Sequence, residues 1–62
     1  MYNNVRKYRE NLAWTKAELA RKANVTPQTV ARMEKNLPTR RDSELKVAKA
    51  LEKSHEKVFP AG

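Results

Sequence analysis

The sequence predicts an all-α fold, a compact bundle of four to five helices. No segment alternates apolar and polar residues over several β-branched positions, as a half-buried strand would. Apolar residues instead recur three and four positions apart, which is the spacing of one helix face. The chain has only 1 glycine, so asparagine, proline and capping residues must form its turns. Its 62 residues are enough for one domain, expected over residues 1–62.

The first two helices are predicted from an apolar face and a capping signal. Residues 4–12 are expected to be helical because three apolar residues share one face there: Val5, Tyr8 and Leu12. The second helix begins at Thr15, because Thr15 and Glu18 have the spacing of a capping box. It ends near Ala23, where Asn24 can adopt the left-handed conformation that terminates a helix.

The third helix restarts immediately after this turn. Thr26 is its expected N-cap, and Pro27 stands at the first helical position, where its missing N–H costs nothing. Val30 and Met33 are its inward residues, and it ends around residues 34–36. The second and third predicted helices and the turn between them form a segment over about residues 15–35.

The rest of the chain contains a loop and two further helices. Residues 36–41 are predicted to be a loop, because Pro38 disfavours helix in the residue before it. A fourth helix is expected over about residues 41–52, capped by either Thr39 or Asp42. Ser54 caps a short fifth helix over about residues 55–59.

Charge indicates the class of partner. Lys and Arg number 14 against 7 Asp and Glu, a net charge of +7, which attracts polyanions such as a phosphate backbone. A membrane-surface helix would need one broad apolar face, whereas the apolar residues here form short clusters separated by turn signals. No run is long enough to cross a membrane, and the start lacks a secretory pattern. A cytoplasmic protein of bacterial, phage or mobile-element origin is therefore expected.

Composition argues against other classes of site. The chain has no cysteine, and His55 is the only histidine, so neither a disulfide framework nor a metal site is expected. The carboxylates are scattered and form no acid–base pair or nucleophile constellation, which argues against an enzyme. No cofactor or small-molecule ligand is expected either.

The segment over about residues 15–35 is the informative one. It predicts a helix, a turn of about three residues and a second short helix with a polar outer face, the pattern of a helix-turn-helix. Such a second helix fits the DNA major groove with its N-terminal residues toward the base edges. Gln28 can pair with adenine and Arg32 with guanine, and the two lie one helical turn apart. Two solvated side chains on a polar helix face would be the alternative.

The order and spacing of several segments resemble the lambda-repressor/Cro-like helix-turn-helix family, also called the XRE family. These segments are residues 15–20 (TKAELA), 24–30 (NVTPQTV), 32–34 (RME), 46–51 (KVAKAL) and 58–59 (VF). The resemblance spans about residues 5–59. It implies a lambda-repressor-like five-helix domain that binds operator DNA, usually as a dimer on a palindromic site. Asn24 replaces the usual glycine, Lys16 a usual glutamine, and Glu44 and Arg41 stand where many members have apolar residues.

The resemblance also implies roles for individual residues. Three occupy positions that face bases: Pro27, Gln28 and Arg32. Seven residues are expected to meet phosphates: Thr15, Lys16, Thr26, Thr29, Lys35, Arg40 and Arg41. Among these, Thr26, Thr29 and Lys35 lie where base edges can also be met. Since Pro27 cannot donate a hydrogen bond to a base, readout should depend on Gln28 and Arg32.

Two further pairs are implied as structural features. Arg9 and Glu34 correspond to a partly buried salt bridge that joins the first and third helices. Val58 and Phe59 are either the last core residues or a contact of a possible homodimer, and both roles are compatible. Trp14 is expected to cover the core, and His55 to lie at the surface.

Three functions remain open from the sequence. The first is a sequence-specific regulator of transcription, a repressor, that binds double-stranded DNA. The second is an antitoxin or another protein-interaction module on the same fold, which an apolar patch around Leu37, Val58 and Phe59 would favour. The third is a nucleoid or RNA-binding protein without sequence preference, which would bind scrambled DNA equally well.

Overall fold

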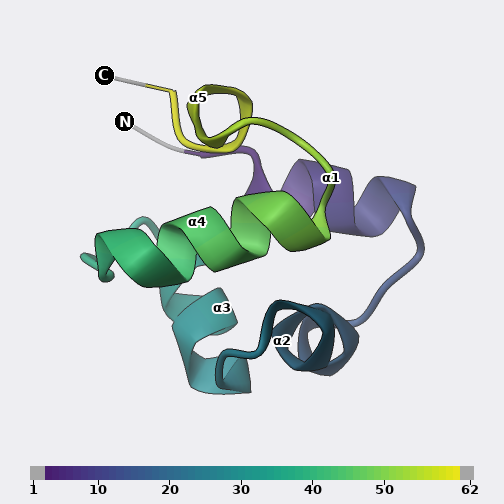
Figure 1. Cartoon of the computed structure of the whole chain (residues 1–62). Coiled ribbons are helices and arrows are strands. Elements are labelled where there is room, and N and C mark those ends of the chain that lie inside the picture. The colour runs from purple at the N-terminus through teal and green to yellow at the C-terminus, as the bar shows by residue number, and fades with distance from the viewer. Residues whose placement is uncertain (1–2, 61–62) are drawn as a thin grey trace.

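The computed structural model describes residues 3–60, and these residues fold into helices without any strand (Figure 1). The helices are α1 (Val5–Asn11), α2 (Lys16–Ala23), α3 (Pro27–Glu34), α4 (Arg41–Ala50) and α5 (His55–Val58). The predicted all-α fold of five helices is confirmed. The molecule measures 27 × 20 × 18 Å, and the first and last segments of the described part, before α1 and after α5, lie close together (Figure 1). Within residues 3–60, no helix has the length and apolar character that crossing a membrane requires.

The caps predicted for α2 and α3 are present. The Thr15 hydroxyl accepts a hydrogen bond from the Glu18 N–H, and the Glu18 carboxylate accepts one from the Thr15 N–H, which completes the capping box. Asn24 ends α2 in the left-handed conformation, with φ 60° and ψ 43°. The Thr26 hydroxyl accepts from the Thr29 N–H, and Pro27 opens α3. These short-range contacts fix the turn between the two helices.

Helix α4 begins at Arg41, as predicted, but its cap and its C-terminal end differ from the prediction. Its N-cap position is Arg40, whose side chain makes no capping hydrogen bond, so neither Thr39 nor Asp42 has this role. The Thr39 hydroxyl instead donates to the Glu44 carboxylate. The helix ends at Ala50 rather than near residue 52, because Glu52 is left-handed (φ 58°) and the Lys53 N–H donates to the Ala48 carbonyl. The fifth helix is capped by Ser54, as predicted.

The core lies where all the helices meet. Helix α2 contacts both α3 and α4, while α1 contacts α3 and α4 contacts α5. The buried apolar residues come from every helix: Val5, Leu19, Ala20, Ala23, Val30, Met33, Val47, Ala48, Leu51 and Val58. Trp14 packs against this core, as predicted, whereas Leu45 is exposed. The core therefore holds α3 by one face only.

Val58 has the first of the two roles that the sequence left open for it, a core residue. Its side chain is 0% exposed, so it is a core residue and has no surface left for a contact with a second subunit. Phe59 is half-buried and packs against the core, and its ring stacks on that of His55 at a centroid distance of 5.1 Å. His55 is itself half-buried and not a fully exposed surface residue. Of the predicted pair, only Phe59 remains accessible.

Candidate nucleic-acid interface

Helix α3 presents one polar face because its other face is anchored in the core. Val30 is 0% exposed and Met33 is 1% exposed, which fixes the rotation of the helix about its axis. The residues on the opposite side are exposed: Pro27, Gln28 and Arg32. Gln28 and Arg32 are one turn apart, so both side chains rise from the same outer surface. This surface has the shape and width that a major groove accepts.

Arg32 has a partner in the free protein. Its Nη2 donates a hydrogen bond to the Pro38 carbonyl oxygen at 3.0 Å. The bond lies in a hollow of about 350 Å³ between α3, the loop and the start of α4. This hollow is lined by Thr29, Arg32, Pro38, Thr39, Arg40 and Ser43. Arg32 would have to exchange this carbonyl for a base edge in order to read DNA.

The predicted phosphate-contacting threonines lie at the starts of α2 and α3. The Thr15 and Thr26 hydroxyl oxygens accept backbone N–H groups as helix caps. The Thr29 hydroxyl lies 2.9 Å from that of Thr26, and either of them can be the donor. A hydroxyl that accepts through its oxygen still carries a proton. The capping threonines can therefore hold the helix ends and donate to a phosphate oxygen.

The predicted cationic contacts are all exposed. Lys16 is the first residue of α2, and Lys35 is the C-cap of α3. Arg40 and Arg41 stand at the start of α4. The loop between α3 and α4 is shaped by the left-handed Asn36 (φ 60°) and by the Leu37 N–H, which donates to the Arg32 carbonyl. The cations thus stand at the start of α2, at the end of α3 and at the start of α4.

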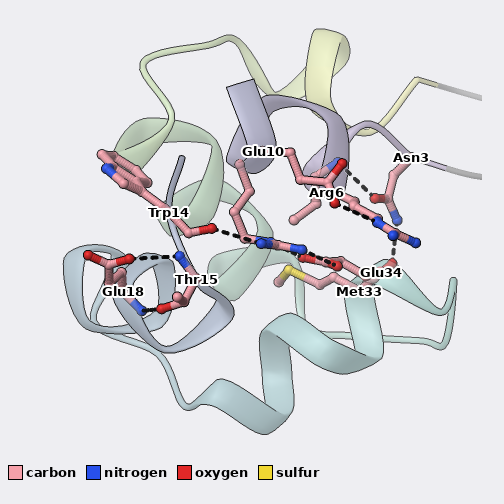
Figure 2. Close-up of polar contacts among 10 residues, drawn as sticks. Asn3, Arg6, Glu10, Trp14, Thr15, Glu18, Met33 and Glu34 are labelled. Carbon is pink, nitrogen blue, oxygen red and sulfur yellow. Dashed lines mark hydrogen bonds and ion pairs between the residues drawn. The ribbon is translucent and has the colours of Figure 1, made fainter. Parts of the chain in front are cut away.

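Arg9 and Glu34 form an ion pair below this surface. Arg9 Nε lies 2.6 Å from Glu34 Oε2, and Arg9 Nη2 lies 3.1 Å from Glu34 Oε1. Arg9 Nη1 also donates to the Trp14 carbonyl at 2.8 Å, so one guanidinium joins α1, α3 and the segment before α2. Figure 2 shows Trp14 and Glu34 on either side of this guanidinium. The two side chains are only 11% and 6% exposed. The hydrogen bond to Glu34 raises the pKa of Arg9 despite partial burial.

Two positioning contacts were not foreseen from the sequence. Asn3 Nδ2 donates to the Met33 carbonyl at 2.6 Å, and Asn3 Oδ1 accepts from the Val5 N–H, which ties the start of α1 to the end of α3 (Figure 2). Glu44 accepts from Thr39 and lies 3.0 Å from His55 Nε2. The only signal for the second contact was the unusual polar residue at position 44. Nothing in the local pattern marked Asn3.

A helix-turn-helix family model matches residues 5–58 of the chain. The chain belongs to this helix-turn-helix family, the lambda-repressor/Cro-like or XRE type. The helix-turn-helix of this member consists of α2, the turn at Asn24 and α3. No curated protein sequence matches the chain significantly.

Solved structures of the regulator SinR are similar to this family member. The solution structure of the N-terminal DNA-binding domain of SinR from Bacillus subtilis has a TM-score of 0.84 and 25% identity, with 98% of this chain and 93% of that chain covered. A crystal structure of SinR in complex with DNA has a TM-score of 0.74 and 30% identity, with 84% and 86% covered. A SinR–SinI complex has a TM-score of 0.78 and 28% identity. The match covers 90% of this chain but only 56% of the matched chain in the SinR–SinI complex.

Proposed function

We propose that this chain is a sequence-specific, double-stranded-DNA-binding regulator of transcription, a repressor that reads the major groove with α3. The observation that carries the proposal is the orientation of α3. Val30 and Met33 fix its inner face in the core, and Gln28 and Arg32 share its outer face. The similarity to the SinR DNA-binding domain and to the SinR–DNA complex supports it.

Each group on this surface has a chemical role in the proposal. The Gln28 amide pairs with the N6 and N7 edge of adenine, and the Arg32 guanidinium with O6 and N7 of guanine. Arg32 loses its hydrogen bond to the Pro38 carbonyl when it reaches a base, so the binding free energy gained from the base contact is reduced by that one hydrogen bond. Pro27 contacts a base only through apolar surface. These contacts would supply sequence preference.

The surrounding residues supply affinity that does not depend on sequence. Their hydroxyl and cationic groups meet phosphate oxygens on both sides of the groove: Thr15, Lys16, Thr26, Thr29, Lys35, Arg40 and Arg41. The positive end of the α3 helix dipole also favours a phosphate near the start of this helix. Because most of this affinity comes from released counterions, binding should weaken steeply as salt rises.

We further propose that the regulator binds a palindromic operator as a homodimer, with Phe59 in the subunit contact. Phe59 is half-buried and lies near the C-terminal end of the chain. The chain spans 56% of the matched protein in the SinR–SinI complex, so the assembly of that protein is not transferred to this one. Such a regulator acts in the cytoplasm of a bacterial cell and performs no catalysis.

A second candidate function is a protein-interaction module on the same fold, such as an antitoxin. Leu37 is 44% exposed and shares a groove of about 530 Å³ with Phe59 and Pro60, and this observation favours it. Because Val58 is buried, the apolar patch is smaller than the sequence predicts.

Selection of binding sites from random duplexes at two salt concentrations tests the leading proposal. The expected result is a two-fold symmetric consensus that is enriched at both concentrations, which would establish sequence preference and pairing on DNA. Equal retention of all sequences would contradict the proposal and favour a nucleoid-type protein. Failure to retain any duplex at low salt would favour the interaction module.

A further inference from the structure

A second surface lies at the other end of α4 from Arg40 and Arg41, two of the predicted phosphate contacts. A groove of about 330 Å³ separates the end of α1 from the end of α4. Its walls include Tyr8, Leu12, Trp14, Ala50, Leu51 and Lys53, and it is called here the Tyr8–Trp14 groove. None of these residues is among the predicted base or phosphate contacts. The proposed DNA-binding function therefore leaves this surface without a role.

The groove offers apolar surface to a partner. Leu12 is 45% exposed, although it is a large apolar residue on the first helix's cap. The rings of Tyr8 and Trp14 are half-buried and pack against the core from outside. Aromatic residues that are partly covered in this way are frequent anchors of protein interfaces. A leucine or phenylalanine side chain fits a groove of this size.

Lysine ammonium groups surround the two rings. Lys22 Nζ lies 5.0 Å from the centroid of Trp14, and Lys53 Nζ lies 5.2 Å from that of Tyr8. Lys7 Nζ lies 5.9 Å from the Tyr8 centroid. A ring face uses little of the hydrogen-bonding capacity of an ammonium group, so these lysines can still bind carboxylates. Glu52 contributes one carboxylate to the groove, whereas three lysines lie over its two rings, so positive charge is in excess there.

The backbone at both ends of the groove is in a costly conformation. Ala13, beyond the end of α1, has φ 59°, and Glu52, beyond the end of α4, has φ 58°. The other left-handed residues are Asn24 and Asn36, and asparagine tolerates this region far better. Backbone strain of this kind tends to occur at binding surfaces. Here both strained residues border the same groove.

We propose that the Tyr8–Trp14 groove docks an acidic segment of a partner protein that carries an apolar anchor. The anchor inserts between the two rings beside Leu12, and carboxylates on either side of it meet Lys7, Lys22 and Lys53. A second copy of this chain is not the expected occupant, because the proposed homodimer is formed through Phe59, which does not line this groove. The opposite charges of groove and partner would also speed their association.

Docking in the groove leaves the outer face of α3 free, because no residue of this helix lines it. Figure 1 shows α4 running from the loop beside α3 toward α1. Its 10 residues separate the start of α4, where Arg40 and Arg41 lie, from the groove by roughly 15 Å. Thr15 and Lys16 follow Trp14 in the chain, but no residue of α3 lines the groove, so we expect a docked acidic partner to leave the base contacts of the regulator in place.

The fluorescence of Trp14, the 1 tryptophan of the chain, tests the proposal directly. The probe is a synthetic peptide with a central phenylalanine–leucine pair and three aspartates on each side. Saturable change of Trp14 emission below about 1 mM peptide is expected, both for the free chain and for the chain bound to duplex DNA. Peptides with alanines at the anchor, or with lysines for the aspartates, should give no saturable change.

Charge-reversal variants locate the site. Lys7→Glu with Lys53→Glu should weaken the peptide about tenfold, because two favourable contacts become repulsive. The double variant Lys46→Glu with Lys57→Glu reverses two exposed lysines outside the groove, so it matches the lost positive charge and should weaken peptide binding far less. An unchanged emission, equal binding of the alanine-anchor peptide, or competition between duplex and peptide would overturn the proposal. DNA binding of the same samples is measured separately, so failure here leaves the DNA-binding proposal intact.

Discussion

At the scale of single residues, the most consequential contact is the ion pair below the DNA-facing surface. Arg9 and Glu34 are far apart in the chain, and only the family resemblance suggested that they meet. The pair is satisfied by three hydrogen bonds of the guanidinium, including one to the Trp14 carbonyl. The Thr39–Glu44–His55 contacts were not predicted, because a hydrogen bond between distant polar side chains leaves no periodic pattern in the sequence.

Replacing Glu34 by alanine should destabilise the domain by about 3 kcal/mol, because it leaves a desolvated guanidinium without its partner. The matched control is Glu10→Ala, which removes the exposed Arg6–Glu10 pair, whose side chains are 71% and 54% exposed. That control should cost less than about 1 kcal/mol. Urea unfolding followed by circular dichroism measures both. Equal losses in the two variants would show that the buried pair contributes no more than a surface pair.

At the scale of helices, the sequence predicted the elements whose ends carry local signals. Thr15, Thr26 and Ser54 each cap the helix that their spacing indicated. The ends of α4 were predicted less well because their causes are not local side-chain signals. Arg40 opens the helix without a cap, and Glu52 closes it in a conformation that glutamate rarely adopts.

Acid should weaken the capping box of α2. The hydrogen bond from the Thr15 N–H holds the pKa of Glu18 below its ordinary value of 4.5, with Arg21 and Lys22 adding to the effect. Because the folded-state pKa is the lower one, this stabilisation is present above about pH 4.5 and is lost as the pH falls through the folded-state value. Glu18→Gln keeps an acceptor that does not titrate. Its unfolding midpoint should fall less than that of the unchanged chain between about pH 6 and pH 3. If the unfolding midpoints of the two proteins fell in parallel with pH, the lost stability would not come from protonation of Glu18.

Ala13→Gly should stabilise the domain by up to about 1 kcal/mol, because glycine enters the left-handed region without the clash of a Cβ atom. Ala13 has φ 59° and is exposed, so no packing is lost. Ala17→Gly, at an exposed position within α2, is the control and should destabilise by about 1 kcal/mol. Thermal unfolding of the two variants compares them. Destabilisation by both would mean that the strain at residue 13 is negligible.

At the scale of the whole molecule, charge and fold act together. The net charge of +7 predicted a polyanionic partner, and the helix-turn-helix provides an arrangement in which exposed cations surround one polar helix face. The sequence predicted the fold class and the outer face of α3, because both follow from periodicity and caps. It could not predict the Arg32–Pro38 bond or the Tyr8–Trp14 groove, since these depend on how distant segments pack.

Lys35→Ala should weaken binding to every duplex by a similar factor, because its proposed contact is with a phosphate. The dependence of log affinity on log salt should become shallower by about one unit. Titrations of a selected and a scrambled duplex at several salt concentrations measure both quantities. A loss confined to the selected duplex would instead make Lys35 a base contact.

The most direct test of the central claim, that the outer face of α3 reads bases, is the affinity of Gln28→Ala for a selected duplex and for its scrambled counterpart. Gln28 is exposed, so the variant keeps the fold. The expected loss is about 1–3 kcal/mol on the selected duplex, with scrambled DNA bound as tightly as before. Unchanged affinity for the selected duplex, or the same loss on both duplexes, would contradict the claim.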